Sequence, residues 1–584
     1  MSDNVASESS WPTWKIALAV GIPVALAGVG FYYYTSRQSK PDEKETAARS
    51  EPEGSSYPPK QVQPDNETKV TSEPPTKQTK FQESQELKNE GNRLFKQSKY
   101  DEAIKKYSEA IEVCPEKNKT EKSTYHQNMA AALEKLENWE GVVKECSCAV
   151  ALNQRYVKAL HRRSKAFEKL GKKESCLEDI TTVCILEGFQ NSTTMVYADD
   201  ILKKIGKEKA SEKYKHRHPM MPSSLFIRQY FASFNDDLIS IPLSDEQHLH
   251  AEHSGYIRAR IALSEGKFVD VIPECSSEIE SIDQPPEAAD STTNPDLSSY
   301  LAEALLMRGT FHLLTGNSAL AKPDLDRVVD MKEANVKLRA NALIKRGSMN
   351  MQLQDTAKAE DDFSLAVEID PENSDVYHHR GQLHILLDKV DAALADFDKC
   401  ISLKPDFAMA HAQRCYTVYR QAFTNKDRAE IEEAMNKFQT IIDDYPSCSE
   451  TYGLFAQAQT DGANYEKADK LFQDAIKIEP ENATLYVHRG LLALQWKQDL
   501  ELAVNLITKA LEVDEKCDFA HETMGTIEVQ RGNLEKATKH FAVSIDYAKS
   551  ELEMAHLFAL QAAAIAQGSI AAKYGLRPPM PGAF

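Results

Sequence analysis

The stretches GSMNMQLQDTAKAEDDFSLAVEIDP, residues 347–371, and GQLHILLDKVDAALADFDKCISLKP, residues 381–405, decide the fold. Each opens with a glycine, continues with an alanine and a phenylalanine, and closes with a proline. Every member of the second set lies 34 positions after its counterpart in the first, including Cys400 after Ala366. A period of 34 residues indicates an array of repeated helix pairs.

The same spacing of residue types returns along most of the chain. Further units carry it at the following positions: Gly91, Ala103, Tyr107, Ala110 and Pro115; Ala434, Phe438 and Pro446; Ala468, Phe472, Ala475 and Pro480; Gly490, Ala503 and Ala510; Gly525, Ala537 and Phe541. A small residue lets two helices approach closely, the aromatic fills the space beside it, and proline ends the second helix. This is the period of the tetratricopeptide repeat, and it predicts an all-α superhelix.

The repeats divide into two arrays because the period lapses between about residues 190 and 250. More degenerate units at 122–155 and 156–189 complete a first array, and others near 256–285 and 300–333 begin the second. We therefore predict a three-repeat domain at 81–190, a helical connector at 191–250, a C-terminal array of seven or eight repeats at 251–570, and a tail at 571–584.

The N-terminal region predicts a membrane anchor. After a short segment, 1–13, no charged residue occurs from Ile16 to Ser36, and at ~1.5 Å per residue such a helix reaches about 30 Å. We place the transmembrane anchor at 14–36. A cleaved signal peptide is the alternative, but bulky tyrosines stand where a small-residue cleavage site belongs. Lysines and arginines follow the span more often than they precede it, which places the bulk of the chain in the cytosol.

Residues 37–80 are rich in Pro, Glu, Lys, Ser and Thr, so they predict a disordered linker. The formal charge of −19 argues against a nucleic-acid binder. Ten cysteines are scattered without a CxxC pair, which favours free thiols over a metal site. No phosphate loop, catalytic triad or metal-spaced histidine cluster is present in the sequence. We expect neither an enzyme nor a cofactor.

Five polar residues recur on the first helices of the three N-terminal repeats: Lys88, Asn92, Asn128, Lys158 and Arg162. The pairs 88/92 and 158/162 are four apart, hence on one helix face. Because first helices line the groove of such a superhelix, the five should converge. Three cations and two amides suit a carboxylate ligand, with arginine able to grip it bidentately. Each cation alone would more simply be part of a solvated surface.

The segments around these residues, LKNEGNRLFKQSKYDEAIKKYSEAIE, YHQN and YVKALHRRSKA, resemble the carboxylate-clamp repeats of chaperone-binding proteins. The resemblance implies that the five residues hold the C-terminal carboxylate and the adjacent Asp side chain of the Glu-Glu-Val-Asp tail of cytosolic heat-shock chaperones. Met129 stands where that family usually has arginine, a departure that leaves the five intact.

The whole chain, including VCILEGFQN, LRANALIKRGSM, VYHHRGQL and KYGLRPP, is similar to the seventy-kilodalton class of preprotein import receptors of the outer mitochondrial membrane. The resemblance implies docking of heat-shock chaperones of the seventy- and ninety-kilodalton classes. It also implies other translocase subunits as partners and capture of preproteins with internal targeting signals by the C-terminal array. Candidate groove residues there, each of which could equally be structural, are Arg346, His378, His379, Arg380, Arg414 and His488. Two rival hypotheses remain: an enzyme with helical repeats, and a chaperone-docking receptor at the endoplasmic reticulum or plastid surface.

Overall fold

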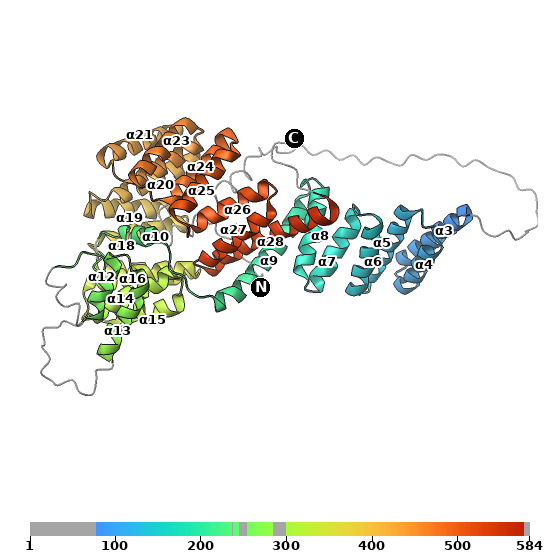
Figure 1. Ribbon diagram of the computed structural model, residues 1–584, viewed down its shortest axis with the longest axis horizontal. Coiled ribbons are helices and arrows are strands. Elements are labelled where there is room, and N and C mark those ends of the chain that lie inside the picture. Colours follow the sequence, from blue (N-terminus) through green and yellow to red (C-terminus); the bar gives the residue numbers. More distant parts are fainter. Residues whose placement is uncertain (1–76, 236, 245–253, 284–299, 577–584) are drawn as a thin grey trace, which may run out of the picture. The chain divides into compact units, whose positions relative to one another are not determined.

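The computed structural model describes residues 77–235, 237–244, 254–283 and 300–576, and in these ranges every regular element is a helix (Figure 1). The predicted all-α fold is confirmed. The predicted anchor at 14–36 lies outside the described residues, as does most of the predicted linker. The first described helix, α3 (Lys77–Lys96), begins within the range 37–80 that the composition assigned to the linker.

The chain forms two compact units. The described part of the N-terminal unit comprises residues 77–204 and 566–576. Its described part holds three helix pairs: α3 with α4 (Tyr100–Val113), α5 (Lys119–Lys135) with α6 (Trp139–Leu152), and α7 (Val157–Lys169) with α8 (Lys173–Leu186). The helices α9 (Ser192–His216) and α28 (Glu551–Tyr574) each contribute one end to this unit. The end of α28 is fixed there by Ser569, whose hydroxyl donates to Glu178 at 2.8 Å.

The described part of the C-terminal unit comprises residues 205–235, 237–244, 254–283 and 300–565. Its described part holds α10 (Ser224–Ala232) and eight helix pairs, within the number that the period predicts. The pairs are as follows: α12 (Gly255–Ser264) and α13 (Val271–Asp283), with the short 3-10 turn η2 (Phe268–Asp270) between them; α14 (Leu301–Leu314) and α15 (Ser318–Asp330); α16 (Val336–Gln352) and α17 (Thr356–Ile369); α18 (Ser374–Leu386) and α19 (Val390–Leu403); α20 (Ala408–Asn425) and α21 (Arg428–Asp444); α22 (Ser449–Asp461) and α23 (Tyr465–Ile478); α24 (Ala483–Lys497) and α25 (Leu500–Val513); α26 (Asp518–Gln530) and α27 (Leu534–Tyr547).

The repeated glycine and aromatic pack directly against each other within a pair. A methyl group on Gly347 would lie 2.8 Å from a ring carbon of Phe363, and one on Gly381 would lie equally close to Phe397. Both rings are fully buried. The small residue is therefore required because the aromatic of the second helix occupies the space that a side chain would need.

A second repeated contact is an ion pair that joins the two helices of a unit. In four units an arginine immediately before the small residue of the first helix bonds an aspartate 16 positions later. These pairs are Arg163–Asp179, Arg308–Asp324, Arg346–Asp362 and Arg380–Asp396. The aspartates are almost completely buried, so each arginine provides the positive charge that makes this burial tolerable.

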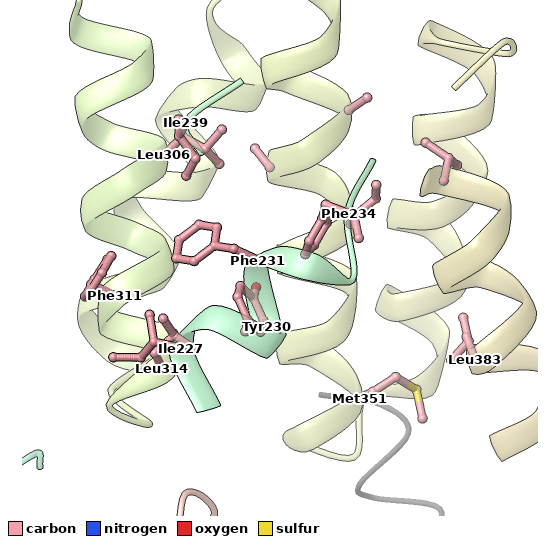
Figure 2. Packing of buried hydrophobic residues seen from close by; sticks show 14 of the residues in the cluster. Ile227, Tyr230, Phe231, Phe234, Ile239, Leu306, Phe311, Leu314, Met351 and Leu383 are labelled. Carbon is pink, nitrogen blue, oxygen red and sulfur yellow. The ribbon is translucent and has the colours of Figure 1, made fainter. Parts of the chain in front are cut away.

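Part of the predicted connector, 191–250, belongs to the hydrophobic core of the C-terminal unit. Residues of α10 and the loop after it pack against first helices of the C-terminal unit, and Figure 2 shows Phe231 between Phe311 and Ile239 above Tyr230. Beneath the aromatic rings, Lys345 of α16 bonds Asp237 at 3.0 Å, with both side chains fully buried. Lys345 also lies 4.8 Å from the centre of the Phe234 ring. This segment is therefore a structural part of the array that follows it.

Helix α28 is long and apolar enough to cross a membrane by length and composition alone. Its side chains Met554 and Leu557 are buried with Ile545 and Ala548 of the preceding segment. The ten cysteines are free, and eight of them are buried, which confirms the prediction of free thiols. Burial raises the pKa of Cys146 and Cys400 to about 12, so these thiols stay protonated at neutral pH.

Candidate peptide-binding site in the N-terminal unit

The five predicted clamp residues lie on the first helices of three consecutive pairs. Helix α3 carries Lys88 and, one turn later, Asn92; α5 carries Asn128; α7 carries Lys158 and Arg162. Helix α5 contacts both α3 and α7. The repeat stacking therefore places the residues on neighbouring helices, with Asn128 on the middle helix, Lys88 and Asn92 on one side of it, and Lys158 and Arg162 on the other.

The two asparagines are joined directly. The amide nitrogen of Asn128 donates to Oδ1 of Asn92 at 3.2 Å, and the hydroxyl of Tyr107 donates to the same oxygen at 2.8 Å. Burial raises the pKa of Tyr107 to about 12, so the phenol keeps its proton at neutral pH. Because both donors use the oxygen of Asn92, its amide N–H groups are left to donate elsewhere.

Tyr107 is a residue whose role the repeat pattern concealed. It occupies the position of the repeated aromatic, against Gly91, and later units have phenylalanine at this position, as at 363, 397, 438, 472 and 541. The hydroxyl is the difference, and it is the group that orients Asn92. The presence of a tyrosine among phenylalanines was the available signal.

Arg162 has a partner that the sequence did not indicate. Its Nε donates to Oε2 of Glu134, on α5, at 2.6 Å, and both side chains are roughly three-quarters buried. Its Nη1 is buried and has no hydrogen-bond partner among the described residues. A buried guanidinium nitrogen without an acceptor is costly, so this edge of Arg162 is suited to an incoming carboxylate.

The next residue, Arg163, differs from Arg162 because all three of its donor nitrogens have acceptors. Its Nε and Nη2 each donate to Asp179 at 2.7 Å, and its Nη1 donates to Ser147 at 3.1 Å. Arg163 is thus engaged within its own repeat, whereas Arg162 is only partly engaged. Lys88 and Lys158 form no ion pair with any described residue. Three cations that are incompletely neutralised favour an anionic ligand here.

Most of the residues predicted for a groove in the C-terminal array lie in its interior. His378, His379 and His488 are almost completely buried. Burial lowers the pKa of His379 to about 4 and that of His488 to about 3, so both are neutral at pH 7. His378 and His379 contact Gln382 of the same helix. Neutral buried rings cannot supply charge to a bound peptide.

The predicted groove arginines are already paired. Arg346 and Arg380 form the intra-repeat ion pairs described above, and Arg346 also bonds Asp326 at 2.8 Å. The aspartate 16 positions after the arginine is a sequence signal that identifies such structural arginines. Arg414 differs, because it bonds Asp398 at a more exposed position, where its side chain keeps 37% of its accessible surface.

Stacked helix pairs with a partly unsatisfied cationic site on consecutive first helices define a protein-binding tetratricopeptide scaffold. The repeat assignment is supported by two families: one described as TPR repeat matches residues 91–118, and one described as tetratricopeptide repeat matches 340–373, 374–407 and 449–482. The described residues contain no group of three or more potential metal ligands.

Whole-chain comparison specifies the scaffold further. The chain is 50% identical over 97% of its length to the mitochondrial import receptor subunit TOM70 of Homo sapiens, covering 94% of that protein. It is 24% identical, over 80% of its length and 77% of the relative, to the TOM70 of Saccharomyces cerevisiae. The crystal structure of yeast Tom70 shares the fold, with a TM-score of 0.50, 23% identity, and coverage of 84% of this chain and 98% of that one.

The chain belongs to the TOM70 family of mitochondrial import receptor subunits. The predicted resemblance is confirmed, and so is the prediction that the chain is not an enzyme, because this is a family of receptors.

Proposed function

We propose that this protein is a receptor of the outer mitochondrial membrane that docks cytosolic heat-shock chaperones by their acidic C-terminal tails and accepts the preproteins they carry. The observation that carries the docking step is Arg162, whose buried Nη1 has no acceptor among the described residues, on a helix that contacts α5, which carries Asn128. Asn128 is in turn bonded to Asn92. A terminal carboxylate provides two acceptor oxygens for such groups. Lys88 and Lys158 add positive charge around it.

The mechanism is a hand-over. A chaperone held at the N-terminal unit raises the local concentration of its preprotein near the C-terminal array, without any further contact between chaperone and receptor. The partners are chaperones of the seventy- and ninety-kilodalton classes, preproteins with internal targeting signals, and other translocase subunits. Within the C-terminal array we retain Arg414 as the groove candidate, because its side chain is the most exposed of the six.

The membrane arrangement is part of the proposal. One span at 14–36 anchors the chain, a linker follows, and the repeats face the cytosol. Imaging the tagged full chain and a variant without residues 1–40 tests this, since the variant should lose its mitochondrial location. A full chain at the endoplasmic reticulum would instead favour the alternative, a chaperone-docking receptor of that membrane.

The docking step is tested by calorimetry on the full chain with a peptide ending in Glu-Glu-Val-Asp. Arg162→Ala should cost ~2–3 kcal/mol of binding free energy, because the carboxylate loses a largely buried charged partner. The control is Lys169→Ala, which removes an exposed charge from the end of the same helix and should leave affinity unchanged. A peptide with an amidated C-terminus should bind weakly. Equal affinities of Arg162→Ala and wild type would reject the site.

A further inference from the structure

The ion pair between Glu134 and Arg162 places a negative charge inside a site that is otherwise cationic. Glu134 lies on α5, the helix that also carries Asn128, and its carboxylate accepts from Arg162 of the next first helix, α7, its one side-chain partner among the described residues. The pair joins the first helices of two successive repeats, α5 and α7, and is distinct from the Arg163–Asp179 pair that joins the two helices of the third repeat.

We propose that Glu134 is a resident counter-charge that sets the affinity and selectivity of the clamp. It holds the Nε of Arg162 and so directs the remaining guanidinium edge toward the ligand. At the same time its charge repels the incoming carboxylates and weakens their binding. The inference rests on the proposed function, since it concerns the same site and the same acidic ligand.

The geometry supports both halves of this role. A guanidinium has five N–H donors in a fixed plane, so an acceptor at Nε fixes the direction of the other four. With Nε taken at 2.6 Å and Nη1 buried without a partner, a ligand carboxylate can be gripped only through the Nη atoms. Its oxygens then lie on the same planar group as the carboxylate of Glu134.

The energetic consequence follows from this proximity. Two like charges that share one guanidinium are separated by a few ångströms in a partly buried site, where repulsion is only partly screened. Glu134 also keeps Arg162 paired when the site is empty, which reduces the cost of an unpartnered buried cation. Glu134 therefore lowers the affinity of the clamp for the tail and stabilises the empty site. This favours rapid release of the chaperone.

The test distinguishes the effect of the Glu134 charge on the ligand from the effect of Glu134 on the orientation of Arg162. Glu134→Gln keeps an oxygen that can accept from Nε but removes the charge, so affinity for the Glu-Glu-Val-Asp peptide should increase by about five- to tenfold. Its salt dependence should also become steeper, because the site has one more net positive charge. Glu134→Ala removes both groups, so it should bind more weakly than Glu134→Gln. The matched control is Glu112→Gln, the same charge change at an exposed position of α4, which should leave affinity as in wild type.

The outcomes distinguish the inference from the proposed function. If Arg162→Ala loses binding while Glu134→Gln binds equally or less tightly than wild type, the counter-charge role is rejected and the clamp stands. If wild type and Arg162→Ala bind the peptide equally, the docking function itself is rejected. Thermal unfolding of each variant shows that the comparison is made between folded proteins, and Glu134→Gln, which is nearly isosteric, should unfold close to wild type.

Discussion

A close approach of two helices at Gly206 in the C-terminal unit gives a specific prediction, the effect of Gly206→Ala. Gly206 lies on α9, and a methyl group there would be 2.2 Å from the backbone oxygen of Ala555 on α28. The Cβ atom of a side chain normally lies at least about 3.4 Å from other heavy atoms. Helices α9 and α28 would therefore have to separate by roughly 1 Å. A backbone carbonyl within a helix cannot move aside as a side-chain end can.

The expected cost is ~2–4 kcal/mol of unfolding free energy. Overpacking typically costs about 1–3 kcal/mol, and separating two helices also removes dispersion contacts along both. Alanine should recover about 1 kcal/mol through its better helix propensity, which places the net cost toward the lower part of this range. Because a chain of this size need not unfold in one step, the assay pairs urea unfolding with amide hydrogen exchange in α28.

The control is Gly453→Ala on α22, where the nearest atom to a new methyl group is a side-chain carbon of Leu485 at 3.7 Å. This variant should be stabilised by up to ~1 kcal/mol. Gly206→Ala should lose exchange protection in α28, and Gly453→Ala should keep it. Equal stability and equal protection in the two variants would refute the steric reasoning.

Three further predictions concern the clamp, the repeat ion pairs and the buried histidines. Tyr107→Phe should keep the fold and weaken tail-peptide binding several-fold in calorimetry, because the clamp asparagine loses its orienting donor, whereas Tyr125→Phe, which removes a buried hydroxyl elsewhere in the same unit, should bind as wild type. Arg380→Ala should cost ~2–4 kcal/mol in urea unfolding because buried Asp396 loses its guanidinium partner and keeps only His384 nearby. The exposed pair of Arg414 should cost only ~0–1 kcal/mol when broken by Arg414→Ala, and equal losses would contradict this. Burial lowers the pKa of His488 to about 3, so below the unfolded value of about 6.5 the unfolded chain binds more protons. Stability should therefore fall as pH drops from about 6.5 toward 3, and His488 alone should contribute ~2 kcal/mol of this loss at pH 5. In thermal melts His488→Gln should remove that share and leave the share of the other buried histidines, such as His379.

The buried Lys345–Asp237 pair shows why the connector was difficult to assign from sequence. The segment after residue 217 has no repeat period, yet it contributes Ile227, Tyr230 and Phe231 to the core of the C-terminal unit. Lys345 would be expected at a surface from its type alone. Its burial depends on a carboxylate more than a hundred positions earlier in the chain, and no local pattern encodes such a contact.

The sequence by itself determined the repeat architecture. The 34-residue period predicts which positions of each unit hold a small residue, an aromatic residue or the proline that ends the second helix. This pattern is local because each pair of helices packs mainly on itself and its neighbours. The placement of Lys88, Asn92, Asn128, Lys158 and Arg162 on first helices also followed from the repeat spacing, whereas their role as a clamp stays a prediction. The same local logic explains why the all-α prediction was confirmed.

Only the tertiary structure decided which charged and polar side chains are available to a ligand. Two adjacent arginines of one helix are treated differently: Arg163 is closed into an ion pair with Asp179, whereas Arg162 is left partly open beside Glu134. The difference depends on acceptors from other helices and on burial, because a charge is free or satisfied according to what surrounds it in space. Helical periodicity predicts on which face of a helix a residue lies, but it does not predict which side chains of other helices contact that residue.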